Sequence, residues 1–147
     1  MCTCSDEQDQ SRQSIINLSE TMKSNPTILL VEDELQQREV LTMLLESQGY
    51  SVISVMDAED GLRRINQTPP DMIVTDVKLP GMDGFTFFEQ LRFNLQYQNI
   101  PFIFITGYND LKAIEQARAL GAVAYVTKPY NLEDLLLMVR SHLPSVS

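Results

Sequence analysis

Acidic, hydroxyl and basic side chains follow four apolar segments of the chain, and their types are those that phosphoryl transfer uses. Glu32 and Asp33 follow the first of these segments, and Asp76 follows a later one. Thr106 and Lys128 follow two more. A carboxylate can attack phosphorus, while a hydroxyl and an ammonium group can bind phosphoryl oxygens and neutralise their charge. These five residues are therefore the candidate reactive group.

The three carboxylates would repel one another if they lay close together. Such repulsion either raises a pKa or is relieved by a bound cation. Oxygen ligands suit a hard divalent ion, above all Mg²⁺ that keeps several of its waters. The residues therefore predict a Mg²⁺ site at Glu32, Asp33 and Asp76. Asp76 is the best candidate nucleophile, because it is central to the group and directly follows an apolar strand.

The segments that must position these side chains alternate between two hydrophobic periodicities. Short apolar runs rich in β-branched residues predict buried strands of a parallel sheet. They are Thr27–Val31, Ser51–Val55, Asp71–Thr75, Pro101–Ile105 and Val123–Thr127. Helical spacing of apolar residues predicts helices over Glu34–Gln48, Ala58–Asn66, Gly84–Asn94, Asn109–Leu120 and Asn131–His142. Each predicted strand is thus followed by a predicted helix.

Regular alternation of strands and helices predicts parallel βαβ units with right-handed crossovers. The expected fold is a doubly wound α/β domain with a five-stranded parallel sheet, five helices and the flavodoxin-like strand order 2-1-3-4-5. In such folds ligands bind at the carboxyl ends of the strands. The first and third strands are neighbours in this order, so Glu32, Asp33 and Asp76 would converge there.

Several residues have conformational roles that their types predict. Gly49 suits the left-handed position after the first helix, and Asn131 suits the N-cap of the last helix. Gly84 is expected to serve a tight turn after the third strand. Glu32 and Asp33 could also cap the first helix, a role compatible with metal binding.

Length and composition limit the class of protein. The chain has 147 residues, of which 44% are hydrophobic, and a net charge of −9. One soluble domain is expected, and the negative charge disfavours binding of nucleic acid and of anionic membranes. No apolar run approaches the roughly 20 residues that span a bilayer, and no secretion signal is evident, so a cytoplasmic location is expected. Residues 1–25 are polar and predict a flexible tail, which leaves 26–144 as the domain.

Five fragments, in their order and spacing, resemble the receiver domain of two-component response regulators. They read ILLVEDE (28–34), DMIVTD (71–76), LPGMDG (79–84), ITG (105–107) and VTKP (126–129). Each fragment is common by itself, but their joint occurrence in a five-unit α/β chain is specific. The likeness extends from Thr27 to about Leu143 and is greatest to single-domain receivers of the chemotaxis-regulator type.

The resemblance implies a phosphoacceptor and a metal site. Asp76 would accept the phosphoryl group, and Asp33 and Asp76 would be direct Mg²⁺ ligands. The main-chain carbonyl of Lys78 would complete the protein ligands, and Glu32 would assist through water. Lys78 also occupies a position that tunes dephosphorylation in the family.

The resemblance also implies a switch. Thr106 would turn toward the phosphoryl group, Tyr125 would follow as an aromatic rotamer, and Lys128 would clamp the phosphoryl oxygens. The family's peptide bond before the proline that matches Pro129 is cis. Tyr108 occupies a second position that tunes dephosphorylation, and we expect its bulk to shield the acyl phosphate from water.

The function that the resemblance implies is a signalling switch, not an enzyme, apart from catalysis of its own phosphorylation and dephosphorylation. The donor would be a histidine kinase or a histidine phosphotransfer protein, because no ATP-binding motif is present in the sequence. No output domain is expected beyond the last helix, so output would be contact with a downstream protein. A homodimer through the switch face is also possible.

Three other interpretations differ in what they need from the sequence. A receiver-shaped interaction module that is never phosphorylated stays open, because sequence shows competence and not use. A phosphoaspartate hydrolase of the haloacid dehalogenase type would carry a second aspartate where this chain has Lys78. A flavodoxin-like flavin or nucleotide binder would need small residues after the first strand, where Glu32-Asp-Glu34 would repel a phosphate.

Overall fold

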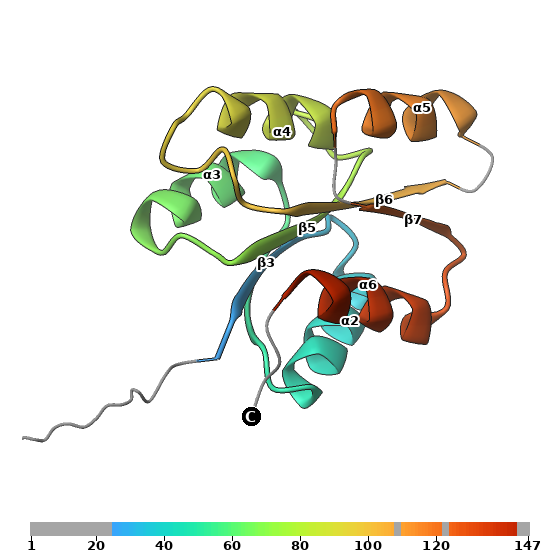
Figure 1. The fold of residues 1–147 in the computed structure, drawn as a ribbon. Coiled ribbons are helices and arrows are strands. Elements are labelled where there is room, and N and C mark those ends of the chain that lie inside the picture. The colour runs from blue at the N-terminus through green and yellow to red at the C-terminus, as the bar shows by residue number, and fades with distance from the viewer. Residues whose placement is uncertain (1–24, 108–109, 122–123, 144–147) are drawn as a thin grey trace, which may run out of the picture.

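The computed structural model describes residues 25–107, 110–121 and 124–143, in which strands and helices alternate (Figure 1). The elements are β3 (Thr27–Val31), α2 (Leu35–Ser47), β4 (Ser51–Val55), α3 (Ala58–Gln67), β5 (Met72–Asp76), α4 (Gly84–Arg92), β6 (Phe102–Gly107), α5 (Leu111–Ala119), β7 (Ala124–Lys128) and α6 (Leu132–His142). The predicted tail lies outside the described residues, apart from Asn25.

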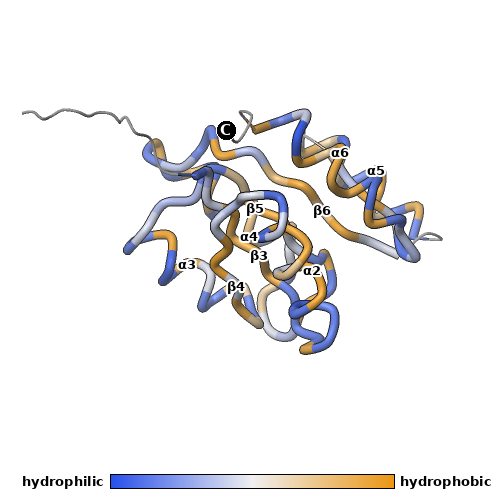
Figure 2. The backbone as a smooth tube through the Cα atoms, turned by 90° about the horizontal axis from the view of Figure 1, so that it is seen from below, coloured by the Kyte–Doolittle hydropathy of each residue, from blue (hydrophilic) through white to orange (hydrophobic). Residues whose placement is uncertain are grey.

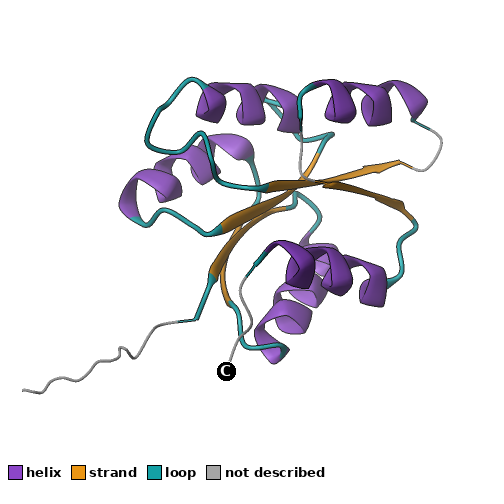
Figure 3. Cartoon of the chain, viewed as in Figure 1, coloured by secondary structure: helices purple, strands orange, loops and turns teal. Residues whose placement is uncertain are grey.

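The strands form one parallel sheet in the order β4-β3-β5-β6-β7. This is the predicted order 2-1-3-4-5, so the fold prediction is confirmed. Helices α3, α4 and α5 cover one face of the sheet and α2 and α6 cover the other, which gives three layers (Figures 1 and 3). No helix within the described ranges has the length and apolar character needed to span a membrane.

Two hydrophobic cores lie on the two faces of the sheet. The aromatic core, under α3, α4 and α5, contains five phenylalanines: Phe85, Phe87, Phe88, Phe102 and Phe104. The aliphatic core, under α2 and α6, is built mainly from leucine, isoleucine and valine. Figure 2 shows the central strands as largely hydrophobic stretches, whereas the helices alternate along their length. This contrast is expected for a sheet buried on both faces by amphipathic helices.

Three strands end later than the apolar pattern predicted. The ladder continues through polar residues, since Asp76 pairs with Ile105 and Gly107 pairs with Lys128. Backbone hydrogen bonds do not depend on side-chain polarity, so a strand can extend past its last apolar residue. Asp76, Thr106 and Lys128 therefore lie within the strands, and the predicted strand ends at Thr75, Ile105 and Thr127 were wrong.

The helix ends agree with most of the local predictions. Gly49 has φ 96° after α2, and the Asn131 side chain caps α6 by accepting from the Glu133 amide at 2.8 Å. The prediction that Glu32 or Asp33 caps α2 was wrong, because the N-cap residue is Glu34. The Glu32 carboxylate instead accepts from the Glu34 amide at 3.0 Å, one step before the helix begins.

Candidate functional site

Strand geometry directs three charged side chains to one side of the sheet. Glu32 directly follows β3, Asp76 ends β5 and Lys128 ends β7. The residues two and four positions before them lie in the aliphatic core: Ile28, Leu30, Met72, Val74, Ala124 and Val126. Because side chains alternate between faces along a strand, the three charged groups point to the same face as these residues. They meet at the carboxyl edge of the sheet.

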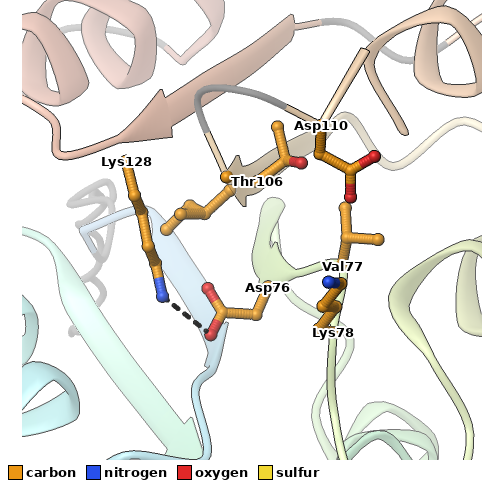
Figure 4. Close-up of a pocket in the computed structure, with 8 residues that line it drawn as sticks. Asp76, Val77, Lys78, Thr106, Asp110 and Lys128 are labelled. Carbon is orange, nitrogen blue, oxygen red and sulfur yellow. Dashed lines mark hydrogen bonds and ion pairs between the residues drawn. The ribbon is translucent and has the colours of Figure 1, made fainter. Parts of the chain in front are cut away.

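The meeting point is a cluster of two buried carboxylates and one partly exposed lysine, with an excess of negative charge. The Lys128 ammonium group donates to Asp76 Oδ2 at 3.3 Å (Figure 4). The same group lies 3.9 Å from Glu32 Oε1. Glu32 is only 1% exposed and Asp76 only 4% exposed. One lysine thus faces two buried carboxylates, and it cannot neutralise both.

The electrostatics of the cluster change the acidity of Asp76. Burial, and after it the negative charge of Glu32, raise the pKa of Asp76 from its ordinary value of 3.8 to about 7. Lys128 opposes both effects by stabilising the carboxylate. At neutral pH Asp76 is therefore divided between its protonated and charged forms, and an added cation would favour the charged form.

The same corner has oxygen atoms that lack partners. Among the described residues, Glu32 Oε1, Asp76 Oδ1 and Thr106 Oγ1 are buried side-chain oxygens without a hydrogen bond. Such atoms cost about 1–3 kcal/mol each unless a ligand satisfies them. Carboxylate oxygens of Glu32, Asp33 and Asp76 lie within 4.8 Å of one another, with Asp33 exposed at the surface. This donor set, all oxygen and short of positive charge, fits a hard divalent cation.

A cavity of about 470 Å³ opens beside Asp76. Its lining residues come from the ends of β5, β6 and β7 and the start of α5: Asp76, Val77, Lys78, Ile105, Thr106, Gly107, Asp110 and Lys128 (Figure 4). In Figure 4 the Lys128 side chain points to the Asp76 carboxylate, and Thr106 lies above it. The cavity is many times the roughly 30 Å³ of one liquid water, so it can admit a phosphoryl group.

The end of β5 is fixed by a close backbone approach at Gly84. A Cβ atom at this position would lie 2.4 Å from the Asp76 carbonyl oxygen, closer than any real contact. The Gly84 amide donates to the Val77 carbonyl at 2.8 Å and closes the loop that follows the strand. The turn expected at Gly84 is present, and its requirement for glycine comes from this contact with Asp76.

Asp110 lines the cavity and was not predicted from the sequence. Its carboxylate caps α5 by accepting from the Ala113 amide at 3.1 Å. An acidic residue directly before an apolar helical pattern is the signature of an N-cap and could have located it. The predicted helix instead began at Asn109, which lies outside the described residues, as does Tyr108 with its predicted shielding role.

Tyr125 lies apart from the cavity. It pairs in register with Phe104, and Thr127 pairs with Thr106, so these four side chains share the face of the aromatic core. Tyr125 is partly exposed and packs against that core. The Lys128-Pro129 peptide bond is cis, as the resemblance implied.

Comparison with protein families identifies one match over most of the chain. The family model of the response regulator receiver domain matches residues 28–140. The sporulation initiation phosphotransferase F of Bacillus subtilis is 28% identical over 120 residues, which cover 82% of this chain and 95% of that protein. The DNA-binding dual master transcriptional regulator RpaA of Synechocystis is 33% identical over 116 residues, but this chain spans only 48% of its length.

Solved structures show the same likeness. A putative response regulator from Chloroflexus aurantiacus superposes with a TM-score of 0.77 at 30% identity, covering 80% of this chain and 97% of that chain. The chemotaxis response regulator CheY4 of Vibrio cholerae superposes with a TM-score of 0.75 at 28% identity, covering 82% of this chain and 100% of that chain.

Proposed function

This chain belongs to the response regulator receiver domain family, whose members are phosphoaspartate signalling switches, and we propose that Asp76 is its phosphoacceptor. The observation that carries this proposal is the position of Asp76. It is a buried carboxylate at the end of the central strand, bonded to Lys128 and open to a cavity that Thr106 also lines. Transfer of the phosphoryl group from the donor to this chain would be one step of a two-component phosphorelay.

The acidic corner would hold Mg²⁺. Asp33 and Asp76 would be direct ligands, the Lys78 main-chain carbonyl would add a third, and Glu32 would act through water. Support comes from the unpartnered oxygens of Glu32 and Asp76 and from the short distances among the three carboxylates. The bound ion would neutralise the carboxylates and bind the phosphoryl oxygens.

In the transfer step, a carboxylate oxygen of Asp76 attacks the phosphorus of the donor phosphohistidine. The new P–O bond forms as the P–N bond breaks, and the electron pair stays on the imidazole nitrogen. Lys128 exchanges its 3.3 Å contact with Asp76 for contacts with the phosphoryl oxygens. Thr106, whose hydroxyl has no other partner among the described residues, donates to one of these oxygens.

The signal would spread from Thr106 to the edge of the sheet. Thr106 and Tyr125 lie on the same face of adjacent strands, so movement of the hydroxyl changes the space available to the tyrosine ring. The surface formed by α5, β7 and α6 would then differ between the two states. Downstream proteins, or a second copy of the chain, would bind this surface and so shift the equilibrium between two existing states.

The donor would approach from the side of α2 and α6. A groove of about 760 Å³ shares Gly107 and Lys128 with the reaction cavity and continues between the first turns of these two helices. Three apolar side chains at this end of the helices are exposed: Leu35, Val40 and Leu132. A histidine kinase or histidine phosphotransfer protein that presents its phosphohistidine here could contact the groove and Asp76 together. The chain would catalyse only its own phosphorylation and dephosphorylation.

Intact mass after incubation with Mg²⁺ and acetyl phosphate tests the proposal. Wild type should gain one phosphoryl group, Asp76→Asn should gain none, and EDTA should prevent the adduct. Asp134→Asn, which removes an exposed acid of α6, is the matched control and should behave as wild type. If folded wild type forms no adduct with any phosphodonor, a phosphorylation-independent interaction module becomes the better interpretation.

A further inference from the structure

Arg118, near the end of α5, makes two contacts with the same tyrosine. Its Nη2 atom donates to the Tyr125 hydroxyl at 2.8 Å, and its guanidinium carbon lies 5.6 Å from the centre of the tyrosine ring. Arg118 forms no ion pair with a carboxylate in the described part of the chain. The described contacts of the guanidinium group are therefore with Tyr125.

These contacts hold the ring in one orientation. Arg118 is exposed, so the hydroxyl of Tyr125 that it binds lies at the surface while the ring packs partly against the aromatic core. Phe104 is the register partner of Tyr125, and Thr106 lies two residues after Phe104 on the same face of the sheet. Inward movement of the tyrosine toward Thr106 would break both contacts with Arg118.

The second arginine with a ring contact in the described residues has a different role. Arg92 of α4 stacks over Phe88 at 5.1 Å, and its Nη1 atom donates to the Leu120 carbonyl at 2.8 Å. It ties α4 to the end of α5, and its ring partner is buried in the core. Arg118 instead contacts a ring on the edge strand that is only partly buried.

We propose that Arg118 is a positioning residue that retains Tyr125 in its outer orientation and so opposes phosphorylation of Asp76. This inference rests on the proposed function. A contact made only in the state with Tyr125 outward stabilises that state by the free energy of the contact. By linkage, it weakens the binding of a phosphoryl group that favours the other state by the same factor. An exposed cation–π contact corresponds to a factor of roughly two to five.

Titration with beryllofluoride and Mg²⁺, a mimic of the phosphoryl group, tests the inference by NMR. Arg118→Ala should bind the mimic about two- to five-fold more tightly than wild type. Lys112→Ala, which removes an exposed positive charge elsewhere on α5, should bind as wild type. Tyr125→Phe keeps the ring and loses the hydroxyl bond, so it should show part of the gain.

A double-mutant cycle separates positioning from a general effect of charge. In a Tyr125→Ala background, Arg118→Ala should not increase the affinity for beryllofluoride any further. In the Arg118→Ala single variant, the NMR contacts of the tyrosine ring protons should move toward residues nearer Thr106. An equal gain in both backgrounds would overturn the inference, as would wild-type affinity in Arg118→Ala. If wild type neither binds the mimic nor gains a phosphoryl mass, the proposed function fails and this inference fails with it.

Discussion

Strands β5 and β7 both end in residues of the site, yet they differ in how the rest of the molecule holds them. β5 pairs with β3 on one side and β6 on the other, and all its residues are buried. β7 is an edge strand that pairs with β6 alone, and only Val126 among its residues is buried. The helices that follow β5 and β6 differ in the same way in the size of their buried side chains. α4 buries three phenylalanines, whereas the buried residues of α5 are Ala113 and Ala117.

The difference separates two requirements of a switch. A phosphoacceptor, the role that we propose for Asp76, must keep its position and its raised pKa, and burial on a central strand provides both. A side chain that reports the reaction must have a second conformation within reach, which needs low packing density. Tyr125 and Arg118 lie in the part of the molecule that meets this second requirement.

Truncation of two register partners should give the largest effect and tests the contrast directly. Phe104 is fully buried and Tyr125, opposite it, is partly exposed. Phe104→Ala should lower the free energy of unfolding by about 3–5 kcal/mol, the cost of a large cavity. Tyr125→Ala should cost less than about 2 kcal/mol, because less of its surface is buried. Urea denaturation of the two variants measures both losses in the free energy of unfolding. Equal losses would contradict the difference in burial between the central part of the sheet and the edge strand.

The next effect is expected at the loop that follows β5. Gly84→Ala places a methyl group against the Asp76 carbonyl, so the backbone of the loop must move. We expect a loss of about 1–3 kcal/mol in stability, together with slower phosphorylation by acetyl phosphate because Asp76 is displaced. Gly107→Ala, in the exposed residue that ends β6, is the matched control for stability. A Gly84→Ala protein with wild-type stability and rate would show that the end of β5 is not rigid.

Much of this arrangement was predictable from periodicity alone. Five alternating strands and helices suit the strand order that the structure shows, and that order brings Glu32 and Asp76 to the same edge. The parity of positions along each strand then places Lys128 on the same face. These are consequences of backbone geometry, which depends little on the identity of neighbouring side chains.

Other features depend on contacts that no sequence period encodes. The contact between Arg118 and Tyr125 depends on the rotation of α5 about its own axis and on the side-chain rotamers. The approach of Gly84 to the Asp76 carbonyl depends on the path of a loop. The strands also continue past their last apolar residues, because backbone pairing does not depend on apolar side chains.

The pKa of Asp76 makes the stability of the protein depend on pH. The pKa is about 7 in the folded state, above the value of roughly 3.9 for an unfolded aspartate, so the folded state binds the proton more tightly. The resulting stabilisation is complete below about pH 4 and is lost as pH rises through 7. Without metal, Asp76→Asn should therefore gain stability relative to wild type as pH rises from 5 to 8.

The size of this gain should be at least on the order of 1 kcal/mol at pH 8, because one pKa unit corresponds to about 1.4 kcal/mol. Urea denaturation in EDTA at the two pH values measures it, with Asp134→Asn reporting the effect of losing an exposed charge. Mg²⁺ should stabilise wild type more at pH 8 than at pH 5, since protons compete with the metal for carboxylates. A difference between Asp76→Asn and wild type that does not change with pH would contradict the assignment.

The smallest effect distinguishes two N-caps, one in the loop after β5 and one in the loop after β6. Asp83 accepts from the Thr86 amide at the start of α4, and Asp110 accepts from the Ala113 amide at the start of α5. Asparagine caps helices about as well as aspartate, so Asp83→Asn and Asp110→Asn should each change stability by only a few tenths of a kcal/mol.

Their effects on phosphorylation should differ, because only Asp110 lines the reaction cavity. Removal of its negative charge should let the anionic acetyl phosphate react about twofold faster, the factor expected for a charge that solvent largely screens. The rate of adduct formation by intact mass, at low and high salt, measures the effect, which salt should diminish. Equal acceleration in Asp83→Asn would mean that net charge, and not the charge beside β6, limits the reaction. Acceleration in Asp110→Asn alone would show that the less buried side of the site also contributes to the rate of the chemical step.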